Sequence, residues 1–64
     1  MRPSRLDHLA LAAEYTLNAR RWWARLAEVY SEDGVTAHCA LYHAEMVRCL
    51  EAARRHLATA KGRG

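Results

Sequence analysis

Residues that interrupt helices, long apolar runs and internal repeats are all scarce in this sequence. Its 64 residues include one proline and three glycines, and the only strong turn signal between residues 5 and 61 is the segment 31–36 (SEDGVT). No apolar run approaches the ~20 residues that a membrane span needs, so we expect no contact with a membrane. A chain with one break and two matched arms is expected to fold as a helical hairpin.

Cysteine is sparse as well. Cys39 and Cys49 are ten residues apart on one predicted helix, which separates them by ~15 Å along its axis. A disulfide needs Cα atoms within about 7 Å of each other, which excludes an intramolecular bridge. Two cysteines without a disulfide framework are typical of a reducing compartment, and residues 1–3 lead into a helix start rather than a signal peptide. We therefore expect a cytoplasmic protein.

Motifs that specify a reaction are missing. The sequence has no paired C-x-x-C elements and no Glu-x-x-His pattern, and two helices alone offer little concavity for a pocket. We predict a non-enzymatic protein without cofactor or catalytic residues. Cys39 and His43 are one helical turn apart, and thiolate with imidazole suits Zn²⁺ or Cu⁺. A metal-binding helical bundle centred on these two residues is therefore kept as a second alternative.

Helical periodicity on both sides of the turn defines a single domain over residues 1–64. We predict a first helix over about 5–30, a turn over 31–35, a second helix over about 36–60 and a frayed tail over 61–64. Ser4 is the expected N-cap, and Ser4 with Asp7 approximates a capping box. Gly34 suits a left-handed cap after the first helix, and Thr36 suits the N-cap of the second.

Apolar residues at steps of three and four define the expected seam between the helices. Folding the chain about residues 32–33 places Trp22 opposite His43 and His8 opposite Leu57. The predicted seam residues are Tyr15, Trp22, Leu26, Val29, Cys39, His43, Met46, Leu50 and Leu57.

The first helix carries a second apolar stripe away from this seam. Its members, which we predict to mediate self-association, are Leu6, Ala10, Ala13, Leu17 and Ala24. A helix that is apolar on two sides usually packs on both of them, and a 64-residue chain buries little surface alone. We therefore expect two hairpins to form a homodimeric four-helix bundle. The alternative is an alanine-rich solvent face, which helix propensity alone would favour.

An arginine- and tryptophan-rich cluster is the most conspicuous local feature. Arg20, Arg21, Trp23 and Arg25 are the predicted contacts with a larger protein, because exposed tryptophan and arginine are enriched at binding hot spots. Arginine with aromatics also suits phosphates and bases, so a nucleic-acid-binding regulator is the first alternative, and a solvated face is the simplest interpretation. We predict a small regulator, adaptor or inhibitor that works through protein–protein interaction.

Charge is distributed unevenly along the hairpin, and this supports both binding hypotheses. Net charge is +3, and Lys61 is the single lysine among mostly arginine basic residues. The basic residues of the open end are Arg2, Arg5, Arg54, Arg55, Lys61 and Arg63, and the acidic residues of the turn end are Glu28, Glu32 and Asp33. A basic end could contact a phosphate backbone or an acidic protein surface.

One segment is similar to a known repeat. Residues 23–30 (WARLAEVY), followed by Gly34 and the small Cys39, resemble the W-x2-L-[GA]-x2-Y spacing of a tetratricopeptide repeat. His43 stands where those repeats usually have an aromatic residue. The resemblance implies antiparallel hairpin packing and protein binding in general.

Overall fold

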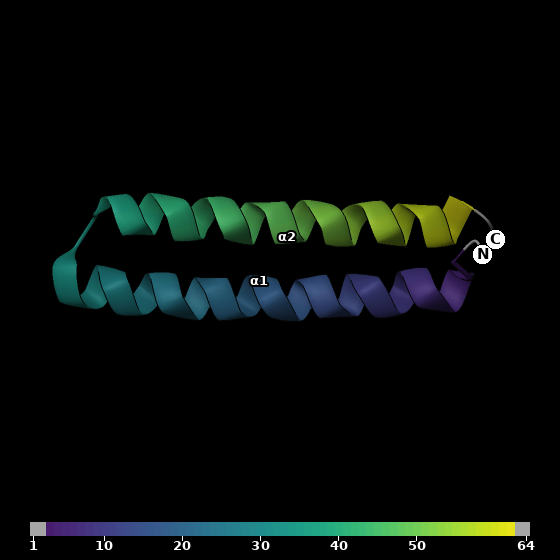
Figure 1. Ribbon diagram of the computed structural model, residues 1–64, viewed down its shortest axis with the longest axis horizontal. Coiled ribbons are helices and arrows are strands. Elements are labelled where there is room, and N and C mark those ends of the chain that lie inside the picture. The colour runs from purple at the N-terminus through teal and green to yellow at the C-terminus, as the bar shows by residue number, and fades with distance from the viewer. Residues whose placement is uncertain (1–2, 63–64) are drawn as a thin grey trace.

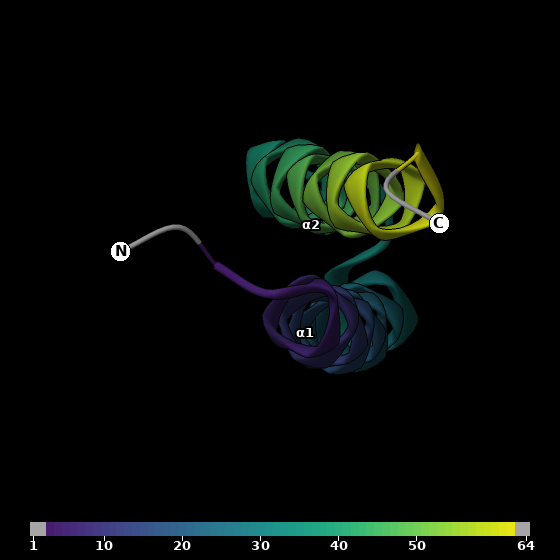
Figure 2. The same ribbon diagram turned by 90° about the vertical axis from the view of Figure 1, so that its right-hand side faces the viewer.

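The computed structural model describes residues 3–62 and contains, in that range, two helices in contact. Helix α1 spans Arg5–Asp33 and helix α2 spans Ala37–Gly62. They run antiparallel side by side, with the start of α1 and the end of α2 at one end of the hairpin and the connection at the other (Figure 1). Viewed end-on, one helix lies beside the other with no third layer (Figure 2). The predicted all-α fold is thus confirmed.

The helix bounds differ from the predicted ones at three places. Helix α1 continues to Asp33, three residues beyond the expected end, and α2 begins one residue later than expected. Lys61 and Gly62, which we expected to fray, belong to α2. The rest of the expected tail, residues 63–64, lies outside the described residues, as do Arg2 and Arg63 of the predicted basic end. Neither helix, within residues 3–62, combines the length and apolar character needed to cross a membrane.

A capping box starts α1, as the sequence predicts. The Asp7 backbone N–H donates to Ser4 Oγ at 3.2 Å, and the Ser4 backbone N–H donates to Asp7 Oδ2 at 2.9 Å. Both bonds satisfy donors that the first turn of a helix leaves unpaired. The backbone N–H of Ser4, and then its side chain, hold the pKa of the Asp7 carboxyl below its ordinary value of 3.8.

This depressed pKa predicts a pH-dependent contribution to stability. Because folding lowers the pKa of Asp7, its stabilising contribution is fully present above pH 3.8 and is lost as the pH falls through the lower, folded-state pKa. The Asp7→Asn variant keeps an oxygen acceptor for the Ser4 N–H and removes the charge. We expect wild type to melt above Asp7→Asn at neutral pH, with the gap closing below pH 3.8 in circular dichroism melts. A gap that is constant across this range would contradict the assignment.

Gly34 ends α1 in a backbone conformation that other residues avoid. Its φ of 73° and ψ of −156° lie in a region adopted essentially by glycine, and its N–H donates to the Tyr30 carbonyl at 2.9 Å. Thr36 then precedes α2, and its carbonyl accepts the N–H groups of Cys39 and Ala40 at 3.1 and 3.4 Å. The reversal of chain direction therefore depends on one glycine.

Substitution of Gly34 tests this dependence without a steric complication. A Cβ atom added at Gly34 would meet no heavy atom within 4 Å, so the cost of Gly34→Ala is the backbone strain alone, ~1–3 kcal/mol. Gly62 is the matched control, because its Cβ would also meet nothing within 4 Å and it lies in α2. Gly62→Ala should leave stability unchanged or raise it slightly. Urea denaturation of both variants distinguishes these outcomes, and equal stabilities would refute the turn assignment.

Only small residues are buried between the two helices. Within the described chain, no large side chain is fully buried. The buried residues are Ala12, Ala19, Cys39, Ala52, Ala53 and Ala60. Alanine at the contact lets the helix backbones approach closely, and larger side chains are displaced to either side of the contact line. The hairpin thus has a narrow, tight seam and no core of large apolar residues.

The register across this seam differs from the expected one by one residue. The ring of Trp22 lies 5.5 Å from that of Tyr42 rather than opposite His43, and the ring of His8 lies 5.2 Å from that of His56 rather than beside Leu57. The physical reason is the packing of alanine. Helix α2 turns Ala52, Ala53 and Ala60 toward α1, and their larger neighbours lie outside the contact.

Shape and surface area both show that the hairpin is extended. Its dimensions are 46 × 18 × 13 Å and its radius of gyration is 14.5 Å, whereas a compact domain of this length has ~11 Å. Its accessible surface is 5105 Å², which exceeds the ~4200 Å² of a compact monomer of this mass by roughly 900 Å². A single hairpin therefore exposes more surface than a folded protein of its size normally does.

Candidate self-association surface

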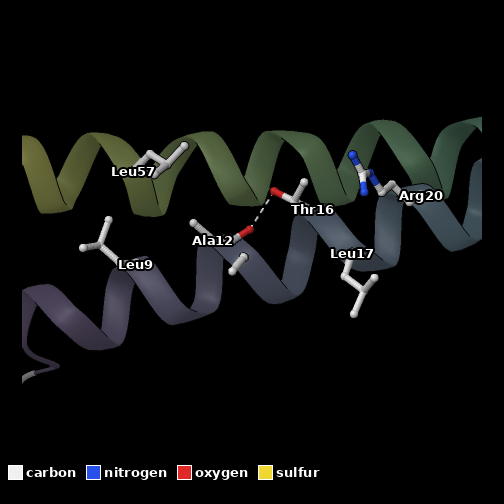
Figure 3. A pocket seen from close by; sticks show the side chains of 7 residues that line it. Leu9, Ala12, Thr16, Leu17, Arg20 and Leu57 are labelled. Carbon is white, nitrogen blue, oxygen red and sulfur yellow. Dashed lines mark hydrogen bonds between the residues drawn. The ribbon is translucent and has the colours of Figure 1, made fainter.

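Large apolar side chains gather on one side of the hairpin, in two adjoining hollows. The first hollow is lined by Leu9, Ala12, Ala13, Thr16, Leu17, Arg20 and Leu57. Leu9 of α1 and Leu57 of α2 flank it, and Leu17 extends away from α2 (Figure 3). Thr16 keeps its hydroxyl satisfied by donating to the Ala12 carbonyl at 2.8 Å, so this polar side chain does not need water.

The second hollow continues the first along the hairpin, because both include Thr16 and Arg20. Its other lining residues are Ala19, Trp23, Met46 and Leu50. We call the joined surface the apolar flank and define it by Leu9, Ala13, Leu17, Trp23, Met46, Leu50 and Leu57.

Exposure along the apolar flank is high for residues of this kind. Trp23 is 57% exposed, Leu17 48% and Leu50 42%. Contiguous apolar patches on a monomeric protein mark interaction sites more often than isolated exposed residues do. The apolar flank is therefore the strongest candidate for a functional surface on the described part of the chain.

The predicted self-association residues divide between the apolar flank and the surface beside it. Ala13 and Leu17 line the first hollow. Leu6, Ala10 and Ala24 are exposed on α1, and Leu6 is 75% exposed, but none of the three lines either hollow. The structure thus moves the centre of this surface toward α2.

Sequence reasoning missed the contribution of Leu9 to this surface. Leu9, Ala13, Thr16, Arg20 and Trp23 are separated by four, three, four and three residues, which is helical spacing. Thr16 and Arg20 interrupt the apolar pattern and conceal it. This stripe could have been found in the sequence by counting Thr16 and Arg20 as part of it, because the methyl group of threonine and the methylene stem of arginine both cover apolar surface.

Three residues of α2 that we predicted to lie in the seam are exposed instead. Leu50 and Leu57, which we predicted in the seam, are 42% and 40% exposed, and His43 is exposed as well. The other predicted seam residues are half-buried, except for the fully buried Cys39; they are Tyr15, Trp22, Leu26, Val29 and Met46. The rotation of α2 toward its alanines accounts for the three exposed residues.

The arginine–tryptophan cluster is split between two surfaces. Arg20 and Trp23 line the second hollow, on the side of the apolar flank, whereas Arg21 and Arg25 line a separate hollow with Asn18 and Trp22. Successive residues of a helix are rotated by ~100°, so four nearly consecutive residues cannot share one face. The Arg25 guanidinium carbon lies 5.8 Å from the centre of the Trp22 ring, within the range of a cation–π contact.

The two residues weighed as metal ligands, Cys39 and His43, lie in different surroundings. Cys39 is buried, its thiol donates to the Gly34 carbonyl at 3.5 Å, and Thr36 Oγ1 lies 3.8 Å from its sulfur. His43 is exposed. Across residues 3–62, no group of three or more histidine, cysteine or acidic side chains is arranged to hold a metal ion. The Cys39 thiol therefore helps to close the turn.

Comparisons with known proteins identify no relative: no family model, no curated protein and no solved structure matches this chain. The resemblance of residues 23–30 to tetratricopeptide spacing gains no support from them. Any functional argument therefore has to start from the surfaces of the hairpin itself.

Proposed function

We propose that this chain is a small, non-enzymatic protein-interaction module that acts as a homodimer. In the dimer, the apolar flanks of two hairpins face each other and form a four-helix bundle. One observation carries the proposal: within residues 3–62 the buried residues are alanines and Cys39, whereas Trp23 and four leucines are exposed along one side of the hairpin; these leucines are Leu9, Leu17, Leu50 and Leu57.

Surface area supports a second copy as the occupant of the apolar flank. The excess of roughly 900 Å² over a compact monomer is close to the ~800 Å² that each partner buries in an interface of standard size. A two-fold dimer uses the same patch on both subunits, so one apolar flank on each hairpin is sufficient.

Charge supports an antiparallel arrangement of the two hairpins. Arg54, Arg55 and Lys61 belong to the C-terminal half of α2, which leads to the open end of the hairpin, and Glu32 and Asp33 are the last residues of α1, next to the connection; Figure 1 shows these two ends. A two-fold axis perpendicular to the long axis places the basic end of each hairpin beside the acidic end of the other. Opposite charges then attract along the edges of the interface, and they specify orientation.

A dimer of this kind leaves a surface free for a further partner. The hollow lined by Asn18, Arg21, Trp22 and Arg25 is distinct from the two hollows of the apolar flank. Arginine beside an aromatic ring is a frequent hot-spot combination. We assign contact with a larger protein to this hollow, so that Arg21 and Arg25 bind the partner while Arg20 and Trp23 serve the dimer.

The mass of the protein in solution tests the proposal. Light scattering coupled to size exclusion should give twice the chain mass of 7.3 kDa, and the melting temperature should rise with protein concentration, as dimer formation requires. A monomer that unfolds cooperatively at micromolar concentration, with a melting temperature independent of concentration, would overturn the proposal.

A further inference from the structure

Two histidines from different helices meet near the open end of the hairpin. His8 of α1 and His56 of α2 are 48 residues apart in the chain, and their Nδ1 atoms are 2.9 Å apart. Both side chains are half-buried. Their ring centres are separated by 5.2 Å and their planes are inclined by 32°. The sequence pattern placed His8 opposite Leu57, so this pair emerges only from the fold.

The surroundings hold both rings in place. Tyr15 stacks on the His56 ring, with the ring centres 5.7 Å apart and the planes inclined by 10°. Ala12 and Ala60, each four residues from one of the histidines on the same helix, are buried. Residues four apart lie on the same helix face, so these alanines bring the two helices close where the imidazoles meet.

Two Nδ1 atoms at this distance have two chemical uses. In a hydrogen bond, one Nδ1 carries a proton and the other accepts it. When both rings carry their proton on Nε2, both Nδ1 atoms have a free lone pair. The ring centres are 5.2 Å apart and the Nδ1 atoms 2.9 Å apart, so the two nitrogens point almost directly at each other, as in a hydrogen bond. Metal–nitrogen bonds of ~2.0–2.1 Å place two nitrogens ~3.3 Å apart around a tetrahedral ion, so each ring has to turn about its χ2 torsion, which is broad, to direct its lone pair at a shared ion.

We propose that His8 and His56 form a bis-imidazole site for a divalent transition-metal ion such as Zn²⁺ or Ni²⁺. The ion joins α1 to α2 near the open end, where no covalent connection does so, and water completes its coordination. Imidazole favours these ions over Mg²⁺ and Ca²⁺. With two protein ligands the ion exchanges with solution and is held more weakly than in a four-ligand structural site. The site does not depend on the proposed dimer.

Calorimetric titration of the purified chain with ZnCl₂ tests this site. We expect one ion per hairpin, a higher melting temperature as ZnCl₂ is added, and loss of binding in mildly acidic buffer, because only neutral imidazole binds metal. NiCl₂ should behave in the same way and MgCl₂ should not bind. If wild-type protein takes up no Zn²⁺ at neutral pH, the proposal is wrong.

Matched variants locate the ligands. His8→Asn and His56→Asn should each abolish one-to-one binding. His43→Asn removes an exposed histidine and Cys49→Ser removes a half-buried thiol, and both should retain binding. Zn²⁺ binding retained by His8→Asn and His56→Asn, or lost in His43→Asn or Cys49→Ser, overturns the assignment.

A measurement on the wild-type chain tests the site even if His8→Asn and His56→Asn fold poorly. In nuclear magnetic resonance spectra, Zn²⁺ should shift the ring signals of His8 and His56 and leave those of His38 and His43 in place. The reverse pattern overturns the proposal whatever the variants do. Since dimerisation is measured separately by mass, failure of this site leaves the proposed function standing, and failure of the dimer leaves this site standing.

Discussion

The Leu17→Arg variant is expected to be a monomer at concentrations where wild type is a dimer. Leu17 is 48% exposed on the apolar flank and extends away from α2 (Figure 3), so its side chain is available to a second hairpin. Fully burying an exposed leucine contributes ~1.5–3 kcal/mol, so burying the exposed half of Leu17 contributes roughly 0.75–1.5 kcal/mol, and a two-fold dimer contains two copies of it. Their loss weakens the dimer by about one to two orders of magnitude, at ~1.4 kcal/mol for each factor of ten.

The helix itself should tolerate this change. Arginine and leucine have nearly equal helix propensities, and the Leu17 side chain contributes little to the seam. Circular dichroism should therefore show retained helix at low temperature, while light scattering shows half the wild-type mass. The melting temperature of the variant should no longer depend on concentration.

Leu41→Arg is the matched control for this experiment. Leu41 is 62% exposed on α2 and is nine residues from Leu50, about two and a half turns, which places it on the opposite side of that helix. The control makes the same chemical change at comparable exposure, away from the apolar flank. It should remain a dimer. A dimeric Leu17→Arg, or a monomeric Leu41→Arg, would show that a different face mediates association.

The Ala53→Leu variant is expected to lose much of its stability. Ala53 is 4% exposed, in a seam whose buried residues are all small, so three added carbon atoms have no space unless the helices separate. Overpacking of this kind costs ~1–3 kcal/mol. At ~4–8 °C per kcal/mol for a domain of this size, the melting temperature should fall by roughly 5–20 °C.

Ala58→Leu is the matched control, because it makes the same substitution at a position outside the seam. Ala58 is exposed on the same helix, and alanine and leucine differ little in helix propensity. Thermal melts at equal concentration should therefore show a large decrease for Ala53→Leu and almost none for Ala58→Leu. An Ala53→Leu protein as stable as wild type would mean that the seam has room, which would contradict close packing through alanine.

Much of the local structure could be predicted because it depends on neighbouring residues. Ser4 and Asp7 form the capping box that their spacing indicates, and Gly34 takes the positive φ expected of a glycine after a helix. Both features arise from hydrogen bonds and torsions within a few residues. The continuation of α1 to Asp33 could not be predicted, since residues 31–33 suit a turn as well as a helix end.

The candidate surfaces could be predicted only in part, because they depend on how one helix is rotated against the other. A hydrophobic stripe on α2 contains both Leu57 and the neighbouring alanines, and its spacing alone does not say which of them faces α1. Alanine at the seam brings the helices closest, and the leucines become exposed. That rotation also places His56, rather than Leu57, beside His8.

The sequence by itself determined that this chain has two helices, that the break between them lies within residues 31–36, and that a single hairpin leaves apolar residues uncovered. These properties follow from periodicity, turn chemistry and length. The tertiary structure alone decided which apolar residues are uncovered, that the arginine–tryptophan cluster is divided, and that two histidines meet across the seam. The reason is geometric: successive residues of a helix are ~100° apart, so a small rotation of one helix moves the side chains beside the seam into or out of the contact, and only the fit of two surfaces selects among such rotations.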